Sequence, residues 1–125
     1  MKTLDTAIRE LDCAYLASGK HCVTASEFLP LTKSEDTLFL DVRTDEENEY
    51  SRYPWALHIP LHKLPESFDR LPKDKLIVPF CSSVFRASLV WGWLKAKGFT
   101  NVRTLTLSTE QIATLLKPTP LFNRG

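Results

Sequence analysis

The sequence predicts a single α/β domain with a five-stranded, mainly parallel sheet and helices on both faces. Strand and helix patterns alternate five times along 125 residues, and short loops join them. Two predicted strands, 38–42 and 76–80, are almost continuously apolar, which is typical of strands buried on both faces. A chain of this length also fits one compact domain.

The first 20 residues are predicted to form a helix that belongs to the same fold. Apolar residues recur at helical spacing from Leu4 to Tyr15, and Gly19 stands where a left-handed C-terminal cap is expected. The apolar face of this helix allows packing on the sheet or a contact in a homodimer, so the chain is expected to be a monomer or a homodimer.

The main body of the domain, residues 21–118, is predicted to begin with a very short strand at 22–23. A helix follows, with Thr24 as its N-cap and Glu27 as the reciprocal partner. Pro30 is expected to limit this helix, because proline removes a backbone hydrogen bond inside a helix.

The middle of the chain repeats this alternation. Thr44 and Glu47 predict a second capped helix near 45–51, whose acidic first turn is expected to face solvent. A strand at 55–59 and an amphipathic helix from 61 to 71 follow, with Pro65 tolerated only in the first turn.

The last third of the domain contains the most apolar predicted elements. In the 76–80 strand, Pro79 fits better near the strand end than at its centre. The helix from 84 to 97 is apolar on several sides and is expected to be well buried, with Trp91 and Trp93 as core and partner-facing residues. The remaining elements are Gly98 as helix terminator, a strand at 101–106, a helix capped by Ser108 and Gln111 and stopped by Pro118, and a C-terminal tail at 119–125.

Composition excludes several classes of protein. Sixteen basic and 15 acidic residues give a net charge of +1, so the basic excess typical of nucleic-acid binders is absent. No apolar run approaches the ~20 residues that span a bilayer, and the N-terminus lacks the apolar core of a secretory signal. Three cysteines are too few for a disulfide framework. We therefore expect a cytoplasmic protein without nucleic-acid or membrane partners.

Cys81 is the candidate catalytic residue. It follows the most apolar strand and precedes a helix, and ligands of parallel sheets bind at the carboxyl ends of strands. The free N–H groups and positive dipole at a helix start favour a thiolate there, and Arg86 adds a cation. We expect the N–H groups of residues 82–86 to converge on the sulfur. The predicted substrate-binding residues are Ser82, Ser83, Val84, Phe85 and Arg86.

The other candidate side chains are interpreted as structural. Cys13 lies in a helix without basic neighbours, and Cys22, beside His21, is placed at the start of a strand and so at the opposite edge of the sheet. His58 lies within a strand, where a hydrogen-bonded imidazole is the simplest interpretation. No Cys-x-x-Cys pair is present, so no metal site is expected.

From about residue 22 to residue 116, the sequence resembles the rhodanese-like (sulfurtransferase) domain in its single-domain form. Four segments match the family. They are the Asp-Val-Arg strand at 38–43, the segment at 54–61 that contains Ile59-Pro60, the approach to the active-site strand at 71–78, and the end of the following helix at 94–102.

This resemblance implies a sulfurtransferase without metal or organic cofactor. Cys81 would attack the outer sulfur of thiosulfate or a similar small anionic donor, hold it as a persulfide, and pass it to a thiol or protein acceptor. Arg86 would bind the anionic end of the donor, while Asp41 and Arg43 would hold the fold.

Two departures from the family pattern leave an alternative open. Val84 stands where the family often has glycine, and residues 105–110 lack the usual glycine-containing turn. A β-branched residue resists positive φ, so a loop that needs this conformation would be distorted. A catalytically weak or inactive rhodanese-like binding or regulatory module is therefore the main alternative. The bulky Val84 and Phe85 also favour a protein or an organic thiol as partner.

A phosphatase or arsenate reductase is the more distant alternative. Those enzymes place five residues between the cysteine and the arginine of their loop, whereas four residues separate Cys81 from Arg86. The shorter loop suits a single sulfur atom better than a tetrahedral oxyanion.

Overall fold

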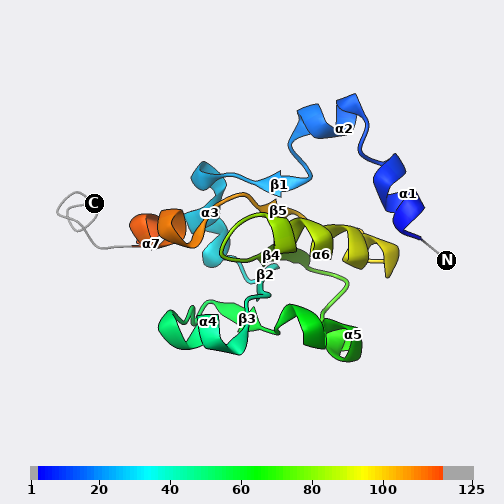
Figure 1. Ribbon diagram of the computed structural model, residues 1–125. Coiled ribbons are helices and arrows are strands. Elements are labelled where there is room, and N and C mark those ends of the chain that lie inside the picture. The colour runs from blue at the N-terminus through cyan, green and yellow to red at the C-terminus, as the bar shows by residue number, and fades with distance from the viewer. Residues whose placement is uncertain (1–2, 117–125) are drawn as a thin grey trace.

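Five short parallel strands form the centre of the fold, and helices lie on both sides of them (Figure 1). The computed structural model describes residues 3–116. Its strands are β1 Cys22–Val23, β2 Thr37–Asp41, β3 Ala56–His58, β4 Leu76–Phe80 and β5 Thr104–Leu105. Its helices are α1 Leu4–Arg9, α2 Cys13–Ser18, α3 Ala25–Thr32, α4 Asp45–Tyr50, α5 Leu64–Ser67, α6 Phe85–Ala96 and α7 Thr109–Leu116, with 3₁₀ turns η1 Leu61–Lys63 and η2 Phe68–Arg70.

The strand order confirms the predicted α/β class. Strands β3, β2 and β4 form one parallel group, and β1 pairs with β5 in another. An isolated parallel bridge between Ile77 and Val102 joins the groups in the order β1-β5-β4-β2-β3. The sheet therefore has five parallel strands, but the pairing in its middle is thin.

Pro79 explains this thin pairing. Ile77 makes both of its backbone hydrogen bonds to the β5 side, to Asn101 O and from Arg103 N. Two residues on, Pro79 faces the same way but has no N–H, so the ladder toward β5 stops after Ile77. On the other side Phe80 O still accepts from Val42 N at 3.1 Å, and the pairing of β4 with β2 stays intact.

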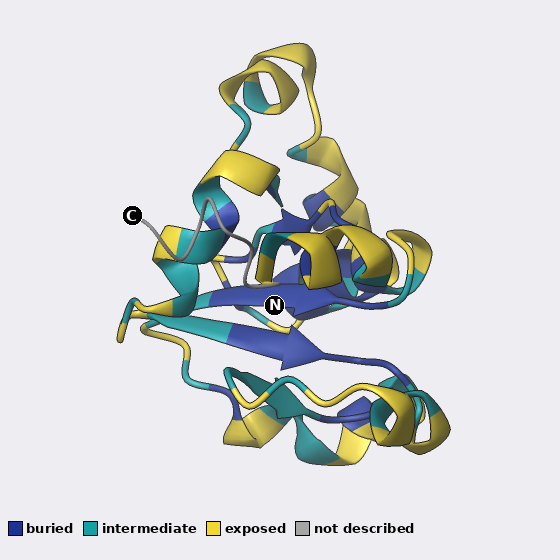
Figure 2. Cartoon of the chain, turned by 90° about the vertical axis from the view of Figure 1, so that its left-hand side faces the viewer, coloured by how far each residue is buried: buried dark blue, intermediate teal, exposed yellow. Residues whose placement is uncertain are grey.

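The sheet separates two apolar cores, as alternation along the strands requires. In β4, Ile77 belongs to the core beneath α1, α5 and α6, while Val78 and Phe80 belong to the aromatic core beneath α3 and α7. Cys81 lies in the first of these cores. Figure 2 shows buried strands between helices whose outer surfaces are exposed.

The prediction of one N-terminal helix is wrong. Asp12 accepts a hydrogen bond from Tyr15 N at 2.9 Å and starts a new helix, α2, so the chain turns after α1. The predicted Gly19 cap is confirmed, with φ of 73°. The buried Ala7 places α1 against α6 rather than against the sheet.

Other boundaries also differ from the predictions. Pro30 lies inside α3, which continues to Thr32. The helix predicted from 61 to 71 is split into η1, α5 and η2, and the fifth strand is only two residues long. The three capping pairs Thr24/Glu27, Thr44/Glu47 and Ser108/Gln111 are confirmed, whereas Pro118 and the tail lie outside the described residues.

The prediction that α6 is well buried holds on one face of the helix and is wrong on the other. Ala87, Val90 and Leu94 are buried, but Phe85 and Leu89 are exposed to solvent. Between residues 3 and 116, no helix is long and apolar enough to cross a membrane.

Candidate active site

Cys81 is the first residue after β4 and lies beneath the N-terminal turn of α6. Its side chain is fully buried, with an exposed fraction of 0%. The backbone N–H of Ala87, in the first turn of α6, donates to the Cys81 sulfur with a nitrogen–sulfur distance of 3.4 Å. The thiol also faces the carbonyl oxygen of Ser83. The start of a helix thus meets the sulfur, as the sequence predicts.

The expected convergence of the amides of residues 82–86 is absent from this conformation. Within the described residues, the backbone amide hydrogen-bonded to the sulfur is that of Ala87, one residue beyond the predicted loop. Val84 has φ of −88° and ψ of −17°, and no non-glycine residue between 3 and 116 has positive φ. An anion nest of successive N–H groups combines right- and left-handed residues, so a loop of this sequence does not form one here.

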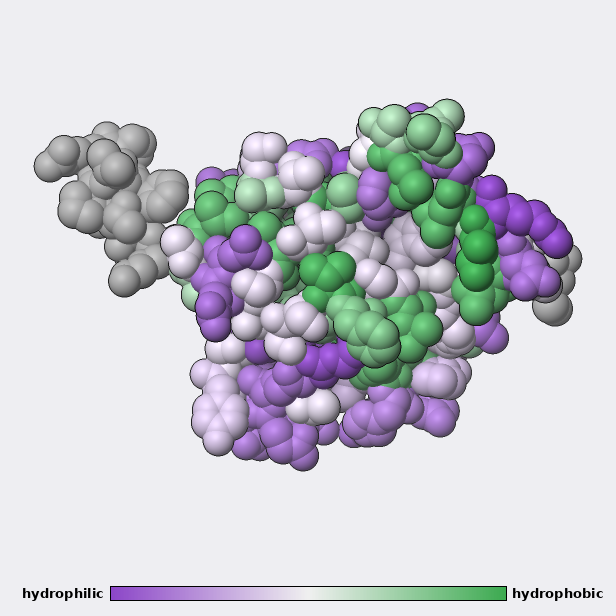
Figure 3. Space-filling model, turned by 45° about the horizontal axis from the view of Figure 1, so that its top comes forward, coloured by the Kyte–Doolittle hydropathy of each residue, from purple (hydrophilic) through white to green (hydrophobic). Residues whose placement is uncertain are grey.

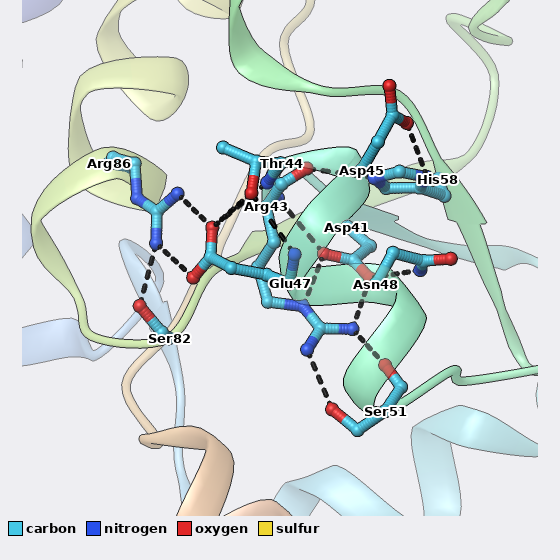
Figure 4. Close-up of polar contacts among 10 residues, drawn as sticks. All are labelled: Asp41, Arg43, Thr44, Asp45, Glu47, Asn48, Ser51, His58, Ser82 and Arg86. Carbon is cyan, nitrogen blue, oxygen red and sulfur yellow. Dashed lines mark hydrogen bonds and ion pairs between the residues drawn. The ribbon is translucent and has the colours of Figure 1, made fainter.

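The Arg86 side chain is held by the carboxylate of Glu47, which lies in α4, the helix that follows β2 (Figure 4). Its guanidinium donates to both oxygens of Glu47, at 2.7 and 2.9 Å, and to Ser82 Oγ at 2.6 Å. The Arg86 hydrogen bond is the main reason that the pKa of Glu47 falls to about 2, and the same bond raises the pKa of Arg86. Arg86 therefore forms an internal ion pair and fixes the Ser82 end of the loop.

The remaining predicted loop residues surround the mouth of the site. Ser82 is half-buried, and its carbonyl accepts from Thr109 N at 3.4 Å. Ser83 is exposed, and Val84 and Phe85 are 36% and 77% exposed. The structure thus brings the loop around Cys81, with an apolar outer rim and a paired cation.

A second ion pair, between Asp41 and Arg43, lies buried at the end of β2, the strand beside β4. Asp41 and Arg43 are 1% and 2% exposed, and the Arg43 guanidinium donates to both Asp41 oxygens at 2.9 and 2.8 Å. Arg43 also donates to Ser51 and lies over the Tyr53 ring at 4.6 Å. Burial lowers the pKa of Arg43, but Asp41 more than offsets this and keeps it above its usual value. This network faces the core, in agreement with its predicted structural role.

Two groups at the site do not follow from the sequence pattern. Glu47 was predicted only as a helix cap with a solvated first turn, and it does accept from Thr44 N at 2.9 Å, but it also binds Arg86. The available signal was an acidic turn after β2, the strand that neighbours β4. The other missed group is the Ala87 amide, which belongs to the helix rather than to the loop.

Cys13, interpreted as structural, is exposed. The prediction that Cys22 lies at the opposite edge of the sheet from Cys81 is wrong: β1 is two residues long, and the partly buried Cys22 lines one surface hollow together with Val84 of the loop. His58 Nε2 lies 2.8 Å from the Arg43 carbonyl, as expected of a hydrogen-bonded imidazole.

Comparison with known proteins identifies the family. The family model described as rhodanese-like domain matches residues 24–114. The chain belongs to the rhodanese-like domain family. It is 33% identical over 75 residues to a sulfurtransferase of Allochromatium vinosum, covering 60% of this chain and 70% of that one. It is 35% identical over 83 residues to a presumed sulfurtransferase of Bacillus subtilis, covering 66% and 81%.

A solved structure agrees with this assignment. The crystal structure of a rhodanese-like domain protein from Staphylococcus aureus superposes with a TM-score of 0.65 at 25% identity, covering 72% of this chain and 88% of that one. The predicted rhodanese-like fold is thereby confirmed.

Proposed function

We propose that this rhodanese-like protein is a sulfurtransferase that carries sulfane sulfur as a persulfide on Cys81. One observation carries the proposal: Cys81 directly follows the β4 strand, and the Ala87 amide at the start of α6 donates to its sulfur. A thiolate at a helix start is a good nucleophile, and the same N–H stabilises the negative charge of a persulfide. The sulfurtransferase relatives support this reaction class.

The proposed reaction balances without a cofactor. The Cys81 thiolate attacks the outer sulfur of thiosulfate, a new S–S bond forms, and the old S–S bond breaks with release of sulfite. The thiolate of an acceptor then attacks the outer sulfur of the persulfide and regenerates Cys81. Both steps are nucleophilic displacements at sulfur, and their rates depend on the attacking thiolate and the leaving group.

The burial of Cys81 requires the loop to open in this mechanism. The sulfur is fully covered, and the Ser83 carbonyl lies against it. Ser83 and Val84 are exposed on their outer side, so a rearrangement of these two residues admits a donor without disturbing β4. Rotation of the peptide bond between Ser83 and Val84 turns the Ser83 carbonyl away and the Val84 N–H toward the place where the outer sulfur of a persulfide lies.

The same burial favours a second candidate function, a non-catalytic binding or regulatory module. Intact mass after incubation with thiosulfate, and separately with an organic thiosulfonate, distinguishes the two. We expect the native chain and the control Cys13→Ser to gain one sulfur atom, and Cys81→Ser to gain none. If no donor adds sulfur to the native chain, the module is the better description. Hydrolysis of p-nitrophenyl phosphate that is lost in Cys81→Ser would favour a phosphatase instead.

A further inference from the structure

We propose that this site selects small organic persulfides with an apolar substituent over dianionic thiosulfate, and that the substituent binds between α5 and α6. The proposal rests on the sulfurtransferase function proposed above and adds its substrate class. Three features of the described residues carry it: the charge at the loop, the exposed apolar face of α6, and a groove that continues from this face.

The charge at the loop is neutralised. Arg86 is the one cationic residue of the loop 82–86. Its Nη1 donates to Glu47, and its Nη2 donates to Glu47 and to Ser82. Glu47 is ionised at neutral pH, so the pair carries no net charge. A dianion would have to compete with a bidentate carboxylate for the guanidinium. A neutral or singly charged donor escapes this competition.

The rim of the site is apolar instead. Phe85, Leu89 and Trp93 recur every four residues and therefore lie on one face of α6. Phe85 is 77% and Leu89 54% exposed, next to the partly exposed Val84. Figure 3 shows hydrophobic side chains gathered at the surface over α6. Exposed apolar clusters of this kind mark binding surfaces.

A groove extends this surface to the flank of α5. Its volume is about 180 Å³, close to the ~150 Å³ of an apolar cavity that holds a benzene ring. It is lined by Leu61, Leu64, Pro65, Leu89, Val90 and Trp93.

The groove lies on the same side of the sheet as the sulfur, because Leu64 and Val90 from its lining belong to the apolar core that contains Cys81. Leu61 N donates to Val42 O at 3.2 Å, and Val42 N donates to Phe80 O at 3.1 Å. Leu61, on one wall of the groove, is therefore connected through two backbone hydrogen bonds to Phe80, the last residue of β4. The other wall is formed by Leu89, Val90 and Trp93, in the second and third turns of α6. A substituent on the donor can lie along α6 while its sulfur reaches the loop.

The chemistry of such a donor is balanced. The Cys81 thiolate attacks the outer sulfur of R–S–SH, forms Cys81–S–SH, and expels the thiolate R–S⁻ with the electron pair of the broken S–S bond. Thiosulfonates are stable probes of the same step, since R–SO₂–S⁻ transfers its outer sulfur and leaves as the sulfinate R–SO₂⁻.

The test compares second-order rate constants for persulfide formation, measured by intact mass, with three donors. Benzenethiosulfonate and methanethiosulfonate share one negative charge and differ in the ring, while thiosulfate carries two charges. We expect benzenethiosulfonate to react about tenfold faster than methanethiosulfonate, as burial of a ring on an apolar surface implies. Thiosulfate should be the slowest of the three.

Three variants separate the two parts of the proposal. Leu89→Ser should lower the ratio of the benzenethiosulfonate rate constant to the methanethiosulfonate rate constant several-fold. Ile8→Ser, at an equally exposed site on α1, should leave this ratio unchanged. Glu47→Gln releases the Arg86 charge and should raise the rate with thiosulfate relative to methanethiosulfonate. Equal rates for the two thiosulfonates, a ratio that Leu89→Ser does not move, or thiosulfate as the fastest donor would overturn the inference while the sulfurtransferase function stands. Absence of sulfur on Cys81 with every donor would overturn both.

Discussion

At the scale of single residues, two arginine–carboxylate pairs hold the site and differ in burial. Asp41 and Arg43 are almost completely buried, whereas Glu47 and Arg86 keep about a quarter to a third of their side chains exposed. A buried charge without its partner is far more costly than an exposed one. The first pair therefore matters for folding, and the second mainly for the charge that the loop presents.

Substitution of Asp41 should destabilise the protein strongly. Asp41→Asn keeps the shape of the side chain but leaves the Arg43 charge buried without a counter-charge, and we expect a loss of about 3–5 kcal/mol in the free energy of unfolding. Urea denaturation measures this loss. Asp74→Asn, at an exposed aspartate, is the control and should change stability by less than about 0.5 kcal/mol. A loss below about 1 kcal/mol in Asp41→Asn would contradict a supporting role for the pair.

Residue pairs also show where prediction from sequence ends. Thr44 and Glu47 are three residues apart, so their capping signature is local and can be recognised without the fold. Glu47 and Arg86 are 39 residues apart, and only the parallel pairing of β2 with β4 brings them together. The position of Cys81 was predictable from a strand followed by a helix, but the orientation of the Ser83 carbonyl depends on loop dihedral angles that no local pattern specifies.

At the scale of elements, α6 connects the candidate site with the N-terminal helix and the sheet. It covers Cys81, packs against β4, and supports α1 through Lys95, whose Nζ lies 3.2 Å from Glu10 Oε2 at an ion-pair distance without hydrogen-bond alignment. Its exposed apolar face was not predictable, because a helix rich in apolar residues looks buried until its neighbours are known.

Two glycines associated with α6 should respond oppositely to the same substitution. Gly92 is a helix-interior residue, and a Cβ there would meet the flexible, half-exposed end of Leu4 at 3.0 Å. Gly92→Ala should therefore stabilise the protein by about 0.5–1 kcal/mol through helix propensity. Gly98 terminates the helix with φ of 98°, so Gly98→Ala should destabilise it by about 1 kcal/mol or more.

Thermal and urea unfolding of both variants test this pair. If Gly92→Ala destabilises the protein, Leu4 cannot yield, and α1 is held more rigidly on α6 than its exposure indicates. If Gly98→Ala is neutral, the left-handed end of α6 is not needed to direct the chain toward β5.

The contrast between local patterns and effects of neighbouring elements also explains which elements were predicted correctly. The strands and the three capped helices follow from local patterns, and all of them form. The N-terminal segment keeps an apolar period from Leu4 to Tyr15, yet Asp12 caps a second helix within it, because a strong local hydrogen bond outweighs periodicity over so short a stretch. The short β5 follows from Pro79 on the neighbouring strand, an effect that only the register reveals.

At the scale of the whole molecule, carboxylate–arginine pairs also connect distant parts of the chain. Glu47 links α4 to α6, and Glu27 links α3 to the β5 side through Arg103, with an oxygen–nitrogen distance of 2.7 Å. The hydrogen bond from Arg103 is the main cause of the lowered pKa of Glu27, as the bond from Arg86 is for Glu47. Both pairs therefore couple the stability of the fold to pH.

The sign of this coupling follows from the protons bound. A carboxylate with a lowered pKa in the folded state binds fewer protons than in the unfolded state, where its pKa is 4.5. Its contribution to stability is complete above pH 4.5 and is lost as the pH falls, for Glu47 down to about pH 2. The free energy of unfolding should thus decline from about pH 5 toward pH 2.

Glu47→Gln and Glu27→Gln isolate the two contributions, since glutamine keeps the capping amide contact. We expect Glu47→Gln to lose about 1–2 kcal/mol at pH 7, and Glu27→Gln to lose less because its carboxylate is more exposed. Urea unfolding at several pH values should show the difference from the native chain shrinking below pH 4.5 and vanishing near pH 2. A difference that stays constant over this range would mean that the ionised pairs do not hold the elements together, and that the Arg86 charge is free to meet an anionic donor after all.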